Sequence, residues 1–406
     1  MRSNLCLGLA LLTLPLAACS SADDSSGADE IGEGGEFSDE GLDGGAGDEL
    51  GDAGADAGDS TTGDPIEPGQ LTAGEWRDLD HWDFWRGLFA PDSTWASYDL
   101  MWGFDTRMRM PVLVSASELP VADVAVVLRD GQGVELWRAR TDNLGRAELW
   151  PGIFGDEVVA PLSIEAGGVE LELAELPSEA ALDPYLIVLD EAPIEPSNLD
   201  LMFVIDTTGS MGDELSYLQS ELGDVIAQVG EQLGGQLDVR VSVNFYRDQG
   251  DAYVVQSNPF TTNIPTALEQ LAGQAADGGG DFPEAAAEAL SDGVLQHQWS
   301  PEARARMLFL VLDAPPHDTP DNRGSIQAAV RAAADQGVRI IPLAASGIDK
   351  PTEFLMRDLD IATGATYTFL TNHSGIGGEH LEPTVGEYQV ELLNELLVRL
   401  IVEAME

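Results

Sequence analysis

The sequence predicts an α/β protein. Its last part should form a doubly wound, mostly parallel sheet, preceded by a small all-β sandwich and a disordered acidic tether. Three observations carry this prediction. From Leu199 onward, apolar runs alternate with amphipathic segments, which is typical of strands and helices in a parallel sheet. Residues 111–195 contain short alternating stretches separated by turn residues. Residues 19–70 hold hardly any large apolar side chain.

The charge balance restricts the kinds of partner. The chain has 406 residues, of which 19 are Lys or Arg and 72 are Asp or Glu, so the net charge is −53. Phosphate backbones are bound by Lys and Arg, so this composition argues against a nucleic-acid partner. It fits cations, basic partners and solubility outside the cell. The hydrophobic content of 44% is sufficient for a normal core.

The first eighteen residues read as a lipoprotein signal peptide. Arg2 supplies a positive charge, and the apolar run Leu5 to Leu16 is too short for a membrane-spanning helix. The run ends in Leu16-Ala17-Ala18-Cys19, which resembles the lipobox of bacterial lipoproteins. The resemblance implies cleavage before Cys19, acylation of its thiol and an anchor in the cell envelope. Ser20 and Ser21 follow Cys19, and no Asp stands directly after it. By the same resemblance, this implies the outer rather than the inner membrane. The alternative is an ordinary signal peptide that happens to contain a cysteine.

Residues 19–70 are predicted to be a disordered tether. No Lys or Arg occurs between Cys19 and Arg77, and the composition is dominated by Asp, Glu, Gly, Ala and Ser. Such a segment buries too little to offset its ordering entropy. A calcium-binding β-roll is the alternative, but the required period is missing. Cys6 and Cys19 are the chain's two cysteines, so the sequence predicts no disulfide in the folded part.

Two segments follow the tether. Residues 71–110 are rich in tryptophan and are expected to pack on the next module, although aromatic stripes also suggest carbohydrate binding. Residues 111–195 are expected to form the β-sandwich. Its turn from Thr141 to Ala147 is similar to that of carboxypeptidase regulatory-like modules. That resemblance implies a spacer or a second binding face.

Residues 196–406 carry the predicted parallel sheet. The apolar run Leu201 to Ile205 ends in Asp206, and a polar turn leads into an amphipathic segment from Leu215 to Leu233. Further strands are expected at 238–245, 252–256, 307–312, 338–343 and 366–370, the second of them an antiparallel edge. Further helices are expected at 264–271, 284–297, 324–336, 352–363 and 388–403.

Oxygen-bearing side chains follow the strand that ends at Asp206. Asp206, Thr208 and Ser210 alternate in the polar turn there. In an open α/β sheet, ligands bind beyond the carboxyl ends of the strands. Carboxylate and hydroxyl oxygens suit Mg²⁺ or Ca²⁺ better than zinc or copper. The pattern therefore predicts a hard-cation site at this end of the sheet.

Together these motifs resemble a von Willebrand factor type A domain, the fold also found in integrins. The family's metal-ion-dependent adhesion site has a first loop D-x-S/T-x-S, matched by Asp206, Thr208 and Ser210, and a third loop with an Asp, matched by Asp313. The resemblance implies bound Mg²⁺, or Ca²⁺ or Mn²⁺, with one coordination position left for a carboxylate of a protein partner.

The second loop departs from the usual family pattern. The Thr expected after a Gly-Gly pair is replaced by Asp281, followed by Pro283 and Glu284, as in integrin β subunits. Glu284 is the better candidate for the direct metal ligand, and Asp281 for a neighbouring ion, but the sequence leaves this choice open. Asp248 is expected to form a salt bridge with Arg247 or a nearby strand; the alternative is that it approaches the metal site.

An enzyme is not expected. A phosphotransfer enzyme with Asp206 as nucleophile needs a second acid two residues later, where Thr208 stands. A phosphate-binding P-loop and a zinc-protease motif are both missing from the sequence. The sequence therefore favours a lipid-anchored adhesion protein, with a periplasmic scaffold for an envelope complex as the alternative and a Mg²⁺-dependent phosphotransfer enzyme as a distant third.

Overall fold

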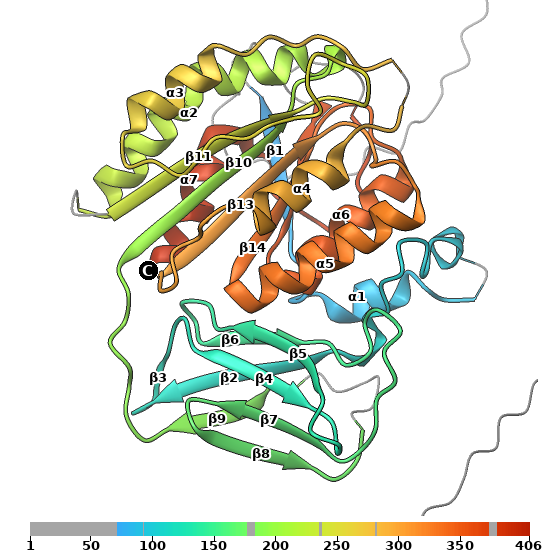
Figure 1. Ribbon diagram of the computed structural model, residues 1–406, viewed down its shortest axis with the longest axis vertical. Helices are drawn as coiled ribbons and strands as arrows, with labels where there is room; N and C mark the ends of the chain where they lie inside the picture. The colour runs from blue at the N-terminus through green and yellow to red at the C-terminus, as the bar shows by residue number, and fades with distance from the viewer. Residues whose placement is uncertain (1–70, 92, 177–182, 235–237, 281, 373–379) are drawn as a thin grey trace, which may run out of the picture. The chain divides into compact units, whose positions relative to one another are not determined.

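The computed structural model describes residues 71–406, apart from 92, 177–182, 235–237, 281 and 373–379 (Figure 1). The predicted signal peptide, the tether, Cys19 and Asp281 therefore lie outside the described residues. Among the described helices, none combines the length and the apolar character needed to cross a bilayer.

An eight-stranded sheet forms the larger part of the fold, and it confirms the predicted doubly wound, mostly parallel architecture. Five neighbouring strands are parallel to one another: β11 (Asp238–Tyr246), β10 (Asn198–Asp206), β13 (Ala305–Leu312), β14 (Val338–Ala344) and β15 (Tyr367–Thr371). The edges are antiparallel: β12 (Val255–Gln256) on one side, and β1 (Thr72–Trp76) and β16 (Glu391–Leu392) on the other.

Helices cover both faces of this sheet, as Figure 1 shows. On β10, Leu201, Phe203 and Ile205 belong to one apolar cluster, whereas Met202 and Val204 belong to the other. The first cluster includes α2 (Gly212–Gln232), α3 (Ile264–Ala272) and α7 (Leu393–Met405), and the second includes α4 (Ala286–Leu295), α5 (Pro320–Gln336) and α6 (Lys350–Thr363). A strand buried on both faces reads as a continuous apolar run, which explains why β10 was recognisable in the sequence.

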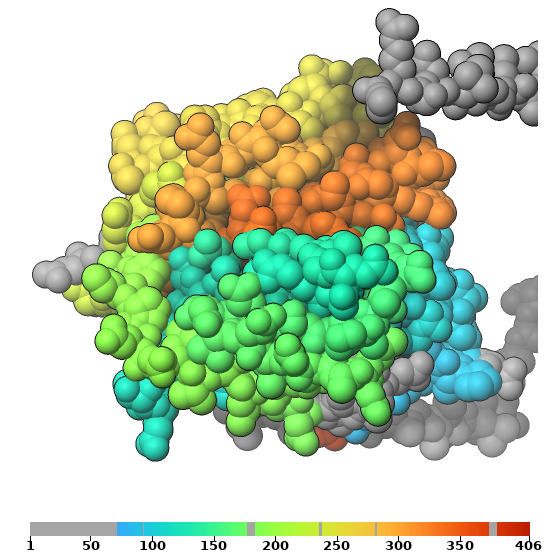
Figure 2. Space-filling view, turned by 60° about the horizontal axis from the view of Figure 1, so that its bottom comes forward, coloured from blue at the N-terminus to red at the C-terminus, as the bar shows by residue number. Residues whose placement is uncertain are grey.

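The middle module consists of two small sheets that share one apolar core. One contains β2 (Met110–Ala116), β3 (Leu119–Pro120), β6 (Arg146–Leu149) and β9 (Tyr185–Leu189); the other contains β4 (Ala125–Arg129), β5 (Glu135–Arg140), β7 (Leu162–Ala166) and β8 (Val169–Leu173). All pairings are antiparallel except that of β2 with β9. The module lies against α5, where Arg331 donates to the carbonyl oxygen of Leu136 at 2.7 Å (Figure 2).

The tryptophan-rich segment packs on two parts of the molecule. We expected residues 71–110 to pack on the next module, and Trp82 lies against Trp150 there, with ring centroids 5.7 Å apart; in addition, β1 is a strand of the large sheet, between β15 and β16. After β1 come α1 (Trp82–Gly87) and two short 3-10 helices at Thr94–Ser97 and Thr106–Met108. The sequence of β1, TAGEW, has no strand periodicity, and it becomes a strand because β15 offers it an unpaired edge.

The five tryptophans of this segment are packing residues, none more than 6% exposed. Trp85 stacks on Phe354 of α6, with ring centroids 5.9 Å apart. The guanidinium of Arg357 lies 4.9 Å from the Trp85 ring and 5.1 Å from the Trp95 ring, and it forms a fully buried ion pair with Asp78. The segment is therefore anchored to α6 of the large domain as well as to the β-sandwich.

Candidate metal site

The first loop of the predicted site begins where β10 ends. Asp206 is fully buried, and its Oδ1 accepts hydrogen bonds from the backbone N–H of Thr208 at 2.8 Å and from the Thr208 hydroxyl at 2.7 Å. The hydroxyl oxygens of Thr208 and Ser210 are 3.3 Å apart. The sequence-predicted residues of this loop therefore come together, with three side-chain oxygens directed to one place.

The second loop lies directly against the first. The N–H of Gly209 donates to the carbonyl oxygen of Gly278 at 3.2 Å. Gly279 has a φ of 71°, and a Cβ there would lie 2.9 Å from Glu284 Oε1 and 3.2 Å from Thr208 Cβ. Only glycine allows this approach, which brings the Glu284 carboxylate beside the first loop.

The third loop follows β13, the parallel neighbour of β10, so Asp206 and Asp313 project from adjacent strand ends. The N–H of Glu284 donates to the carbonyl oxygen of Pro315 at 2.9 Å, which ties the second loop to the third. The structure thus brings together Asp206, Thr208, Ser210, Glu284 and Asp313. Asp281 is outside the described residues.

The three carboxylates are buried and incompletely bonded. Among the described residues, Asp206 Oδ2, Glu284 Oε2 and Asp313 Oδ1 make no hydrogen bond of ordinary geometry, although the Tyr246 hydroxyl lies close enough to the Asp206 carboxyl to lower its pKa against the larger effect of burial. Burial raises the pKa of Asp206 to about 7, and the charge of Asp313 contributes. Burial, followed by the charge of Asp206, raises the pKa of Glu284 to about 8. Burial also raises the pKa of Asp313, although a hydrogen bond from Ser210 opposes this.

These oxygens fit a hard divalent cation. Buried carboxylate oxygens without donors are costly, and a cation would supply the missing charge. Within the described part of the chain, no three carboxylate, imidazole or thiol groups form a compact metal-binding cluster by themselves. Any ion held here would therefore depend on the hydroxyls of Thr208 and Ser210 in addition to the carboxylates.

Sequence reasoning missed Glu214. It lies in the first turn of α2, is 2% exposed, and its Oε1 accepts a hydrogen bond from the Ser346 hydroxyl at 2.7 Å. Its other oxygen finds no partner among the described residues, and its charge acts on Asp313. The available signal was its position four residues after Ser210, one helical turn from the loop.

A second layer of polar contacts surrounds the loops. Of the partners expected for Asp248, Arg247 is not the one found: Asp248 Oδ1 lies 2.7 Å from Nε2 of His317, whereas Arg247 pairs with Asp277 at 3.7 Å. Asp251 Oδ2 accepts hydrogen bonds from the N–H groups of Asp248 and Gly279. These contacts hold the second and third loops in place, and they are long-range contacts that neighbouring sequence does not indicate.

Comparisons with known proteins agree with this fold. The model of the von Willebrand factor type A domain family matches residues 200–373. An ariadne-like RING finger protein of Acanthamoeba polyphaga mimivirus is 31% identical over 122 residues, which are 29% of this chain and 11% of that protein. The chain thus spans about a tenth of the length of this relative. The pilus adhesin SpaC of Lactobacillus rhamnosus GG, in its open conformation, is similar with a TM-score of 0.36 and 12% identity, over 52% of this chain and 30% of that chain.

The region matched by the family model contains the five parallel strands of the large sheet. The matched region runs from the start of β10 to just beyond the end of β15, and it includes the first and third loops that were predicted from their oxygen ligands. Residues 200–373 form a von Willebrand factor type A domain, and the chain extends its sheet at one edge with β1 and β16.

Proposed function

We propose that this protein binds a protein partner through a divalent cation, Mg²⁺ or alternatively Ca²⁺ or Mn²⁺. The observation that supports this most strongly is the set of buried carboxylate oxygens without donors on Asp206, Glu284 and Asp313. They meet the hydroxyls of Thr208 and Ser210 at the carboxyl ends of β10 and β13. These five residues would hold the ion, with Asp281 serving a neighbouring ion.

The cation would supply a Lewis-acidic position for a carboxylate of the partner, because hard anionic oxygen is its preferred ligand. The second loop tunes this affinity. Asp281 or Glu284 takes the place of a neutral Thr in this loop, so the site carries additional negative charge beside the ion. We therefore expect tighter retention of the metal and weaker attraction of an anionic ligand than at a site with Thr.

The setting we propose is the cell envelope, with the chain anchored through a lipid on Cys19, in the outer membrane rather than the inner. The role we propose is binding and not catalysis, because Thr208 cannot act as the general acid that phosphotransfer from Asp206 would need. A scaffold that gathers a periplasmic complex uses the same site and differs only in the location of its partner.

The metal is tested first and alone. Calorimetric titration with Mg²⁺ is expected to show binding to the full chain and none to Asp206→Ala. Asp224→Asn is the matched control, because Asp224 is an exposed carboxylate of α2 outside the oxygen set. Unchanged Mg²⁺ affinity in Asp206→Ala, with the fold intact by circular dichroism, refutes the proposal.

The partner is tested next. Pull-downs with Mg²⁺ and with EDTA are compared, using intact cells of other strains or hosts in one arm and solubilised envelope of the same cells in the other. Capture from foreign surfaces that depends on Mg²⁺ supports adhesion, whereas Mg²⁺-dependent capture from the protein's own envelope supports the scaffold. Phosphatase activity that disappears in Asp206→Asn would instead favour the enzyme.

A further inference from the structure

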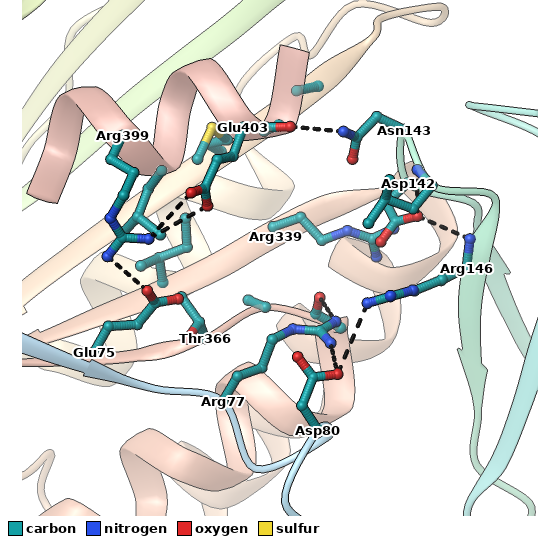
Figure 3. Close-up of a pocket in the computed structure, with 18 of the residues that line it drawn as sticks. Glu75, Arg77, Asp80, Asp142, Asn143, Arg146, Arg339, Thr366, Arg399 and Glu403 are labelled. Atoms are coloured by element: carbon teal, nitrogen blue, oxygen red, sulfur yellow. Dashed lines mark hydrogen bonds and ion pairs between the residues drawn. The ribbon is translucent and has the colours of Figure 1, made fainter. Parts of the chain in front are cut away.

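A cavity of about 870 Å³ lies at the opposite end of the sheet from the metal site (Figure 3). Its walls come from segments far apart in sequence: residues 75–81 at the end of β1, the turn 141–146 of the β-sandwich, the starts of β13, β14 and β15, and α7. Strand β10 separates the two ends by about 26 Å, given eight steps of about 3.3 Å between its nine residues. The cavity is therefore a separate feature.

Arginine is concentrated in the lining of this cavity. The whole chain has 19 basic residues against 72 acidic ones, yet six arginines line this one cavity: Arg77, Arg146, Arg304, Arg306, Arg339 and Arg399. Six carboxylates line it as well, those of Glu75, Asp80, Asp142, Glu387, Glu391 and Glu403, so an excess of positive charge can only be local. Two of them are well neutralised. Arg399 is paired with Glu75, Glu391 and Glu403, and Arg304 is paired with Glu195.

On the side facing the β-sandwich, guanidinium groups outnumber carboxylates. Arg77 and Arg146 share Asp80, at 2.8 and 3.8 Å. In the same way, Arg306 and Arg140 share one carboxylate, that of Asp123, at 2.9 and 3.1 Å. On this side, two aspartates therefore neutralise the charge of four arginines only in part.

Arg339 adds a fifth guanidinium. It donates to the carbonyl oxygens of Thr363 at 2.6 Å and Arg140 at 2.8 Å, and no carboxylate within the described residues lies at ion-pair distance from it. Burial lowers the pKa of Arg339, and the charges of Arg77 and Arg306 add to this, although Asp142 and Glu148 oppose it.

Two other carboxylates on this side, those of Asp142 and Glu148, do not neutralise the excess positive charge. Asp142 points toward the same region in Figure 3, but its Oδ1 accepts hydrogen bonds from the backbone N–H groups of Leu144 and Arg146 and shapes the turn. Glu148 is held by Arg109 in a bidentate pair. Positive charge that is incompletely neutralised in a cavity favours a bound anion.

We propose that this cavity binds a small ligand through an oxyanion group, a carboxylate or a phosphate, seated against Arg77, Arg146 and Arg339. Figure 3 shows these three side chains extending into the cavity from three different segments. The planar guanidinium is suited to bidentate contact with both kinds of oxyanion. Since the three arginines belong to the β1 segment, the β-sandwich and the large domain, the ligand would also fasten these parts together.

Calorimetric titration and thermal melting test this with inorganic phosphate in one arm and succinate in the other, on the full chain. All measurements contain EDTA and constant ionic strength, so that neither metal nor screening contributes. We expect saturable binding of at least one probe and a higher melting temperature in its presence. The arm that binds distinguishes a phosphate ligand from a carboxylate ligand.

Arg146→Gln and Arg339→Gln are expected to weaken this binding about tenfold or more, as for loss of a charge-assisted hydrogen bond. Arg323→Gln is the matched control, because Arg323 is an exposed arginine paired with Asp318 away from the cavity. Arg146 has a 46% exposed side chain, so its variant tests the proposal even if Arg339→Gln fails to fold. Binding of neither probe, or equal binding in all variants, overturns the proposal.

Discussion

Asp206 should destabilise the protein when no metal is bound. The side chain is fully buried, and its pKa is raised from 3.8 to about 7. The ionised form is therefore disfavoured in the folded state by about 4 kcal/mol relative to the unfolded chain, since one pKa unit corresponds to about 1.4 kcal/mol. Replacing Asp206 by Asn removes this charge and keeps an Oδ1 that can accept from Thr208.

The stability gained by Asp206→Asn is smaller than the value of about 4 kcal/mol by which the ionised Asp206 is disfavoured. The new amide group takes the place of Oδ2, which has no partner among the described residues, and an unsatisfied buried amide costs about 1–3 kcal/mol. We therefore expect Asp206→Asn to raise the free energy of unfolding by about 1–3 kcal/mol at pH 8.5 without metal. The variant should at the same time lose its response to Mg²⁺.

The pH dependence has a definite sign. A carboxyl group whose folded pKa is raised binds more protons in the folded state, so stability falls as pH rises. The loss attributable to Asp206 begins near pH 4 and is complete above about 7, and Glu284, with a pKa of about 8, extends the decline. Below pH 4 both carboxyl groups are protonated in either state, and Asp206→Asn should lose its advantage in stability over the wild type.

Urea denaturation followed by tryptophan fluorescence measures these differences, in EDTA at pH 5 and 8.5 and then with Mg²⁺ at pH 8.5. Asp224→Asn makes the same change in charge at an exposed position and controls for the net charge of −53. The reasoning fails if Asp206→Asn is less stable than the wild type at pH 8.5 in EDTA. It also fails if Asp206→Asn gains as much stability from Mg²⁺ as the wild type does.

Two further predictions concern the rest of the chain. Arg357→Met leaves the buried Asp78 without its cation, so we expect the free energy of unfolding to fall by about 3–5 kcal/mol in urea denaturation at neutral pH. A loss below about 1 kcal/mol would mean that the pair contributes little to anchoring the tryptophan-rich segment. Cys19→Ser removes the predicted acylation site, so the protein should move from the membrane pellet to the soluble fraction. Its retention in the pellet would contradict the lipoprotein interpretation.

The central strands and the first and third loops were predictable from the sequence because their signals are local. A strand such as β10, buried on both faces, is a continuous apolar run, and the residue after it must lie at the end of the sheet. The position of Asp206, Thr208 and Ser210 at the end of the sheet can therefore be predicted from the local sequence alone. The same holds for Asp313 at the end of β13.

The edge of the sheet was not predictable in this way. Thr72–Trp76 and Glu391–Leu392 have no strand pattern. They are strands only because β1 pairs with β15, about 300 residues away in sequence, and β16 then pairs with β1. For the same reason, the sequence placed a helix over 388–403, whereas α7 begins at Leu393, after β16. In the sequence, Glu214 is an ordinary polar residue of an amphipathic helix. Its role depends on the contact with Ser346, which only the folded structure reveals.

The two ends of the domain carry opposite electrostatic imbalances, which the overall composition conceals. At the carboxyl end, Asp206, Glu284 and Asp313 are buried without cations, and at the amino end, the half-buried Arg339 has no carboxylate at ion-pair distance among the described residues. Such groups oppose folding and persist only if the surrounding packing outweighs them. The helices on both faces and the Arg357–Asp78 anchor supply that packing between the two ends. A ligand at either end would relieve its own imbalance and stabilise the folded state by mass action, which makes both ends sites where binding is favoured by the fold.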